Sequence, residues 1–306
     1  MLPPSRKLRL TDVFIHSDML LHHPFSQWTQ FTLNTASSTI TKLSLQLTEE
    51  TSSTWKIFSA TLSFPFLRDF SFKNYFIGPD IAAFVDVEDF LVNHPQIGRV
   101  YIHGVGLPPS KSVPRPGFQQ LTFFDAHPLY IVWLMNTFIL SPNALPALQR
   151  VVISADCGYS SRRDFDYLLF DLALESIAAF PRNIALALTF NSRRHLDDWL
   201  RSHICAGVEQ SVISRLEHVN ILSIYDGWDE YTEATIACFP DWLQLFPALR
   251  HLKFGTASGK NAGNLTEPKF MATISVLCQK LETIEVDQQT FDLQLVRRNL
   301  GNGAGD

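Results

Sequence analysis

The stretch Gly255–Lys260, GTASGK, has the residue types of a phosphate-binding loop. A P-loop needs GxxxxGK followed by Ser or Thr, because its backbone wraps the phosphates and the hydroxyl reaches magnesium. Here only three residues separate Gly255 from Gly259, and Asn261 stands where the hydroxyl is needed. Pro268 also interrupts the long helix whose N-terminus would complete an anion site. The stretch therefore predicts a loop between structural units and no nucleotide cofactor.

Other residue types that could do chemistry lack the spacing that the chemistry requires. His16, His22 and His23 are not spaced as ligand pairs on a helix. An acidic run that could face a basic ligand or calcium departs from the EF-hand pattern: Asp226, Asp229, Glu230 and Glu233. The chain contains no GxSxG or HExxH motif. We therefore predict no catalytic residues, no metal site and a protein that is not an enzyme.

The composition sets the class of protein and of partner. Of 306 residues, 46% are hydrophobic, and the formal net charge is −5, which argues against non-specific nucleic-acid binding. The longest apolar run, Leu129–Leu140, is too short for a membrane span and predicts a buried helix. The four cysteines form no CxxC pair, and the N-terminus has no signal-peptide pattern. These features predict an intracellular protein, cytoplasmic or nuclear, that binds neither membrane nor nucleic acid.

A degenerate repeat runs through most of the chain. Its pattern is apolar-x-x-apolar-x-apolar, with units that end on average about 31 residues apart. Eight units match: Ile40/Leu43/Leu45, Leu67/Phe70/Phe72, Ile97/Val100/Ile102, Phe118/Leu121/Phe123, Leu148/Val151/Ile153, Leu216/Val219/Ile221, Leu249/Leu252/Phe254 and Leu281/Ile284/Val286. Weaker units contain Leu8/Leu10 and Leu186/Leu188, and the sixth unit also fits the register Val219/Leu222/Ile224.

Each repeat predicts a helix, a turn and a short strand. Four units place a proline two residues before the first apolar anchor, where it ends a helix and favours extended backbone: Pro65, Pro95, Pro146 and Pro247. Helical periodicity precedes some of these turns: Ile81, Phe84, Glu88 and Leu91, and again Ile236, Phe239, Leu243 and Phe246. A lone strand or a lone amphipathic helix cannot bury its apolar side, so the units must stack.

The predicted fold is therefore an α/β leucine-rich-repeat solenoid, a horseshoe with a parallel sheet on the concave face and helices on the convex face. We expect one irregular domain of about ten units over residues 1–300 and a flexible tail over 301–306. The proline-rich segment 106–117 reads as a long loop between repeats, since anchors resume after it. The rival interpretation is a two-domain α/β enzyme of unknown activity, divided at this segment.

The units FLVNHPQIGRVYI and LQLFPALRHLKF, with LRLTDV near the start, resemble the irregular repeats of F-box-type proteins of mushroom-forming fungi. The resemblance implies that the repeats hold a substrate for a cullin-type ubiquitin ligase, whose subunits would be further partners. In that family an N-terminal F-box docks the ligase. No F-box segment precedes Leu8 here, so we expect any F-box to be supplied elsewhere.

Side chains between the anchors predict the binding surface. In a strand, residues alternate between the two faces, so those beside the anchors should point to the concave face. We expect a protein partner there, contacted by Lys73, Tyr101, His103, Phe124, Ser154, Lys253 and Glu285. Tyr101, His103 and Phe124 would form an aromatic cluster on neighbouring strands, a composition typical of interface hot spots. Lys253 and Glu285 would make the C-terminal end of this face polar.

Overall fold

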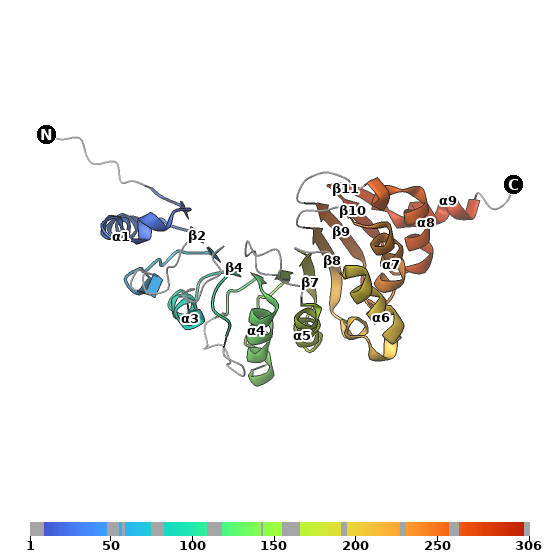
Figure 1. Ribbon diagram of the computed structural model, residues 1–306, viewed down its shortest axis with the longest axis horizontal. Coiled ribbons are helices and arrows are strands. Elements are labelled where there is room, and N and C mark those ends of the chain that lie inside the picture. The colour runs from blue at the N-terminus through green and yellow to red at the C-terminus, as the bar shows by residue number, and fades with distance from the viewer. Residues whose placement is uncertain are drawn as a thin grey trace. The chain divides into compact units, whose positions relative to one another are not determined.

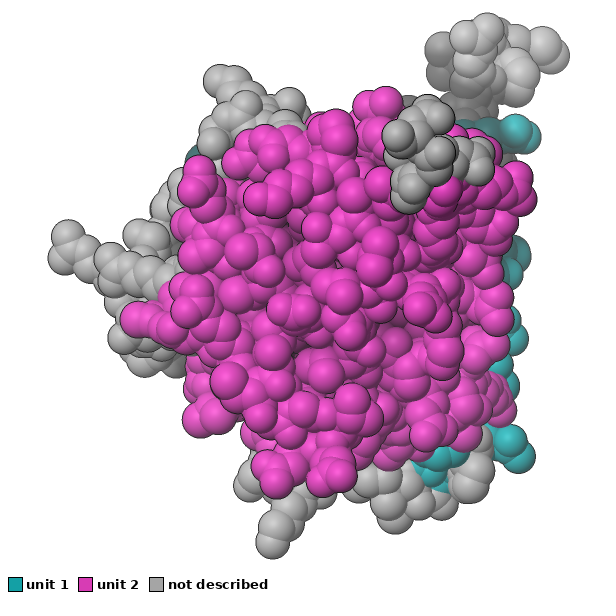
Figure 2. Space-filling model, turned by 90° about the vertical axis from the view of Figure 1, so that its right-hand side faces the viewer, with its two compact units in different colours: residues 1–148, 156–161 teal, residues 149–155, 162–306 magenta. Residues whose placement is uncertain are grey.

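A computed structural model describes ten stretches of the chain: residues 9–47, 55–56, 59–74, 83–108, 118–141, 143–154, 166–190, 195–226, 231–256 and 263–302. They form an α/β fold whose strands are mostly parallel (Figure 1). The chain divides into two compact units, which Figure 2 colours separately: Met1–Leu148 with Asp156–Ser161, and Gln149–Ala155 with Arg162–Asp306. The division falls near residue 148, not in the proline-rich segment 106–117. The single repeat domain stays a prediction.

Unit 1 carries five parallel strands in chain order: β1 (Asp12–Ile15), β2 (Lys42–Leu47), β3 (Asp69–Asn74), β4 (Arg99–His103) and β5 (Phe123–Ala126). Its described helices are the short 3-10 helix η1 (Asp18–Leu21), α1 (Phe25–Ala36), α3 (Phe84–Val92) and α4 (Pro128–Leu140). The α-helices lie on one side of these strands (Figure 1). Among the described residues of unit 1, no α-helix lies on the opposite side of the sheet (Figure 1).

Unit 2 repeats this plan with β6 (Arg150–Ser154), β7 (Ile184–Phe190), β8 (Val219–Asp226), β9 (His251–Thr256) and β10 (Thr283–Val286). A final strand, β11 (Gln289–Asp292), pairs antiparallel with β10. The helices are α5 (Tyr167–Ala178), α6 (Leu196–Gln210), η2 (Val212–Arg215), α7 (Glu233–Leu243), η3 (Gly263–Thr266), α8 (Pro268–Leu277) and α9 (Leu293–Asn302). Gly301 and Asn302, predicted to begin a flexible tail, belong to α9 instead.

The repeat anchors form the core between strands and helices. In β2 and β3 the pattern alternates between buried and half-buried positions, and Leu43, Leu45, Phe70 and Phe72 are completely inaccessible. The anchors of the two strands pair with each other, Leu43 with Phe70 and Leu45 with Phe72. The predicted strands over these units are therefore confirmed, because only this alternation hides one apolar face of every strand.

The register of three units differs from the prediction or resolves an open choice. The first strand begins at Asp12 and buries Ile15, so its anchors are Leu10/Val13/Ile15 and not Leu8/Leu10. In β5 the anchors are Leu121/Phe124/Ala126 and not Phe118/Leu121/Phe123. In β8 they are Val219/Leu222/Ile224, the alternative register. Each revised triplet also matches the repeat pattern, and pairing with the next strand decides between them.

The proline-containing turns precede the strands as expected, with Pro65, Pro95, Pro146 and Pro247 all in turns. The polar residues beside Pro95 connect neighbouring repeats. His94 Nε2 accepts the backbone N–H of Phe64 at 3.1 Å, and its Nδ1 lies 2.7 Å from the Phe90 carbonyl oxygen. Gln96 Nε2 donates to the Phe64 carbonyl oxygen at 2.5 Å. These bonds satisfy backbone groups of the previous turn that no strand or helix pairs.

The helices partly follow the predicted periodicity. α4 covers the apolar run Leu129–Leu140, as expected of a buried helix. α3 buries Phe84, Val87, Phe90 and Leu91, whereas Glu88 is only half-buried. Ile81 lies outside the described residues. α7 ends at Leu243, and Phe246 is buried beyond it. No helix in the described ranges is long and apolar enough to cross a membrane.

Candidate binding surface

The side of the unit 1 sheet without helices, here called the open face, presents an ordered array of side chains. Because the strands are parallel and in register, outward residues of neighbouring strands form rows across the sheet. Asp12, Lys42, Asp69 and Arg99 form one row, in which opposite charges stand side by side. The other described members of the open face are Phe14, Ser44, Gln46, Ser71, Lys73, Tyr101, His103, Phe123 and Asp125.

Arg99, Tyr101 and Phe123 form the densest contact on this face, here called the Arg99 cluster. The rings of Tyr101 and Phe123 have centroids 4.8 Å apart. The Arg99 guanidinium carbon lies 5.1 Å from the Phe123 centroid, within cation–π range. Arg99 Nη2 also donates to the Tyr101 hydroxyl at 2.7 Å, while its Nε lies 3.9 Å from Asp69 Oδ1. Half of the Arg99 side chain is exposed, so the cluster combines an aromatic surface with an accessible cation.

Phe124 is not part of this surface, and its predicted orientation is wrong. The side chain is completely inaccessible and belongs to the core. Phe124 pairs with the anchor Val100, whereas Phe123 pairs with the outward residue Arg99. A slip of one residue exchanges the two faces of a strand, so Phe123 takes the outward place that had been expected for Phe124. The sequence permits Leu121/Phe124/Ala126 as an alternative triplet, which would place Phe123 outward, and Arg99 precedes the anchor Val100 at an outward position.

His103 lies on the open face but is only 2% exposed, so it is not the accessible aromatic residue that was expected. Its Nε2 lies 3.3 Å from Asp125 Oδ1, on the next strand. Among the described residues, no hydrogen-bond partner reaches its buried Nδ1. Lys73, half-buried, is paired with His103 from the strand before. The structure thus brings Lys73, His103 and Asp125 together beside the Arg99 cluster.

On the corresponding face of unit 2, several outward side chains are buried or hydrogen-bonded to one another. Ser154 is 5% exposed and is therefore not available as the contact residue that was expected. Arg150 Nη2 donates to the Tyr225 hydroxyl at 3.0 Å, from β6 to β8. The strand β7 lies between them, and its outward residues Ala185 and Ala187 are small enough for Arg150 and Tyr225 to meet across it.

The C-terminal end of this face is polar, as the sequence predicts. Lys253 Nζ donates to Glu285 Oε2 at 2.6 Å, and the two side chains are 44% and 33% exposed. They occupy paired positions on β9 and β10. Exposed pairs of this kind contribute little to stability, about 0–1 kcal/mol, so this pair stays open to competition from a partner's charges.

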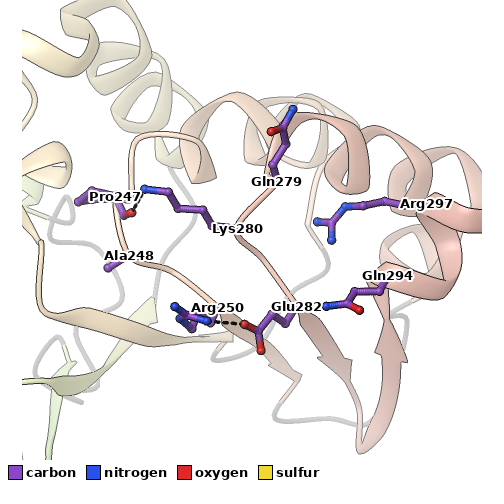
Figure 3. Close-up of a pocket in the computed structure, with 8 residues that line it drawn as sticks. All are labelled: Pro247, Ala248, Arg250, Gln279, Lys280, Glu282, Gln294 and Arg297. Atoms are coloured by element: carbon purple, nitrogen blue, oxygen red, sulfur yellow. Dashed lines mark hydrogen bonds and ion pairs between the residues drawn. The ribbon is translucent and has the colours of Figure 1, made fainter.

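A pocket of about 380 Å³ lies in unit 2 at the turns that precede β9 and β10 (Figure 3). Its three cationic side chains are bound to the protein itself. Arg250 contacts Glu282 at 2.6 Å, and Lys280 donates to the Pro247 carbonyl oxygen at 2.7 Å. Arg297 donates to the carbonyl oxygens of Ser275, Cys278 and Leu281 at 2.7, 2.9 and 2.7 Å. Arg297 therefore caps the C-terminus of α8, which makes the pocket a structural junction.

An Asp–His–Ser chain lies on the helical side of unit 2, and the sequence motifs did not indicate it. His203 Nε2 lies 3.1 Å from Asp171 Oδ1, and its Nδ1 lies 3.0 Å from Ser211 Oγ. Ser211 Oγ also accepts the backbone N–H of Ile213 at 3.2 Å, and the residue is 2% exposed. A buried hydroxyl that caps η2 is poorly placed to attack a substrate. These hydrogen bonds instead connect α5, α6 and η2 to one another.

The remaining candidates give no assembled site within the described residues. In these stretches no three His, Cys, Asp or Glu side chains come together as metal ligands would. Asp229, Glu230 and residues 257–262 of the GTASGK loop lie outside the described residues. A search with protein-family models finds no match to this chain, and no curated protein matches it.

Proposed function

We propose that this chain is a non-catalytic protein-interaction scaffold of the leucine-rich-repeat type, which captures a protein partner on the open face of unit 1. The observation that carries the proposal is the Arg99 cluster, an arginine held over two neighbouring rings on a sheet face without helices. Tyr, Trp and Arg are the residue types that dominate binding energy at protein interfaces. Their fixed geometry lowers the entropy lost when a partner docks.

The charges around the cluster support a protein partner over a nucleic acid. Asp12, Asp69 and Asp125 stand beside Lys42 and Lys73 on the same face, so it carries no continuous basic stripe. Nucleic-acid binding relies on many Lys and Arg contacts to phosphates. A mixed-charge rim around an aromatic centre is instead typical of protein interfaces.

We also propose, from the resemblance of the repeats to fungal F-box-type proteins, that the captured protein is a substrate for a cullin-type ubiquitin ligase. The parallel strands at the repeat positions, β1 to β5 in unit 1 and β6 to β10 in unit 2, support the repeat fold on which this proposal rests. Ligase subunits would then copurify with the chain.

The test is affinity purification from the native cell with matched variants. Tyr101→Ala with Phe123→Ala should reduce capture of the partner at least tenfold, the effect of losing about 1.4 kcal/mol of binding energy. The control is Phe66→Ala with Val85→Ala, which removes exposed apolar side chains of unit 1 outside the strands. Equal capture by both variants would contradict the assignment of the Arg99 cluster. Copurified cullin subunits would support the ligase role.

A further inference from the structure

Exposed aromatic side chains are concentrated in the first repeat. Among the described residues, five Phe and Trp side chains are exposed, and four of them lie between residues 14 and 31: Phe14 (55%), Phe25 (45%), Trp28 (62%) and Phe31 (71%). Met19, between them, is 64% exposed. Phe14 lies on the open face and the other three aromatic residues lie on α1. Concentrations of exposed apolar side chains are typical of interaction sites on proteins.

The helix α1 carries exposed aromatic residues beside its buried ones. Phe25, Trp28 and Phe31 follow a three-residue spacing that places them on one side of the helix. Thr29, Leu33 and Ala36 are the buried residues of the same helix. The core of unit 1 therefore accounts for one face of α1 and leaves the aromatic face uncovered.

The first strand also has an open edge. β1 pairs with β2 on one side, and within the described stretches no strand pairs with its other side. The C-terminal end of unit 2 differs, because β10 is covered by the antiparallel strand β11. An open edge with exposed apolar side chains is a template for pairing with another strand.

The residues of β1 match themselves in an antiparallel pair centred on Phe14. Directly opposite residues of such a pair share one face of the sheet. Phe14 would face Phe14 of a second copy, and Val13 would face Ile15, which keeps the helix-side residues together. Asp12 would face His16, so the outer positions are complementary in charge and hydrogen bonding.

We propose that this chain forms a two-fold symmetric homodimer in which the β1 edges of two copies pair antiparallel, and in which the aromatic face of α1 is covered by the second copy. The two-fold axis passes through the Phe14 pair. Since an antiparallel pair joins two sheets into one, the two open faces point to the same side. Each dimer then presents two Arg99 clusters together, which raises the effective concentration for a partner with two contact sites.

The first experiment measures mass by light scattering across a concentration series of the full chain. We expect a dimer at about 100 µM, where a contact with a Kd of about 10 µM is largely formed. Trp28→Ala with Phe31→Ala should raise this Kd at least tenfold, while circular dichroism stays unchanged because both side chains are exposed. A monomer at every concentration overturns the proposal. A dimer that these substitutions leave intact overturns the role of α1.

Cysteine crosslinking tests the register. Opposite residues of an antiparallel pair have Cα atoms about 4.5–5.5 Å apart, within the range of a disulfide. Phe14→Cys should therefore give a covalent dimer on mild oxidation, above the wild-type background. Asp12→Cys, on the same face of the same strand, is the control, because its counterpart lies four residues away across the pair. Equal crosslinking of the two variants overturns the proposed register.

Discussion

Gly104→Ala is expected to destabilise unit 1 strongly. Gly104 follows β4 with φ +67°, a conformation that side chains rarely adopt. An added Cβ would lie 1.9 Å from the carbonyl oxygen of Asn74, at the end of β3. The added Cβ and the Asn74 carbonyl oxygen are both held in place by the backbone. The ends of β3 and β4 would therefore have to separate.

The magnitude follows from three terms. Left-handed backbone costs alanine about 1–2 kcal/mol relative to glycine. Forcing an atom into a packed position costs about 1–3 kcal/mol. Lower entropy of the unfolded chain returns about 0.4–1 kcal/mol. The free energy of unfolding should therefore fall by about 1–5 kcal/mol, a large part of the 5–15 kcal/mol typical of a domain.

Gly207→Ala is the matched control. Gly207 has the same φ of +67°, but no atom lies within 4 Å of its added Cβ. With ψ −170°, its backbone lies in a region that is essentially restricted to glycine and that costs other residues about 1–3 kcal/mol. Its loss should therefore be about 1–2 kcal/mol, from the backbone conformation alone. Hydrogen exchange of peptides around each glycine, with urea unfolding of the whole chain, measures both losses. If the two variants lose equal stability, the close approach of Gly104 to Asn74 does not constrain the fold.

Three further predictions concern buried polar groups. Arg297→Lys should lower the free energy of unfolding by about 2–4 kcal/mol, because lysine cannot bond all three carbonyl oxygens at the end of α8. The control Arg298→Lys, at an exposed position, should change this free energy by less than about 0.5 kcal/mol. Urea unfolding measures both changes. Burial lowers the pKa of His94 from 6.5, so on acidification the unfolded chain takes up this proton before the folded chain does. Stability should therefore fall as the pH drops below about 6.5. His94→Gln should flatten the pH dependence of the urea midpoint, and an unchanged slope would contradict the role of His94. Burial raises the pKa of Cys278 to about 12, so iodoacetamide at about pH 8 should modify the exposed Cys205 and spare Cys278 until the chain unfolds, as peptide mass analysis would show. Similar labelling rates for both thiols would refute the burial of Cys278.

Local patterns in the sequence predicted most of the repeated strands of this fold, but not the final strand β11 or the helix α9. An apolar triplet after a proline-containing turn, as in Pro65 and Leu67/Phe70/Phe72, indicates a strand because alternate side chains must be buried. A helical period before the turn indicates the helix that buries them. Those two signals lie within about ten residues of each other, so no knowledge of distant contacts is required.

Register and side-chain partners depended on the tertiary structure. Both Phe123 and Phe124 fit the repeat pattern, and only pairing with Arg99 and Val100 decides which ring is buried. His103 stands at an outward position yet is buried, because residues far away in the sequence, such as Asp125, lie against it. Neighbours on the adjacent strands determine the burial and hydrogen bonding of an outward side chain. The spacing of residues along one strand does not reveal which neighbours these are.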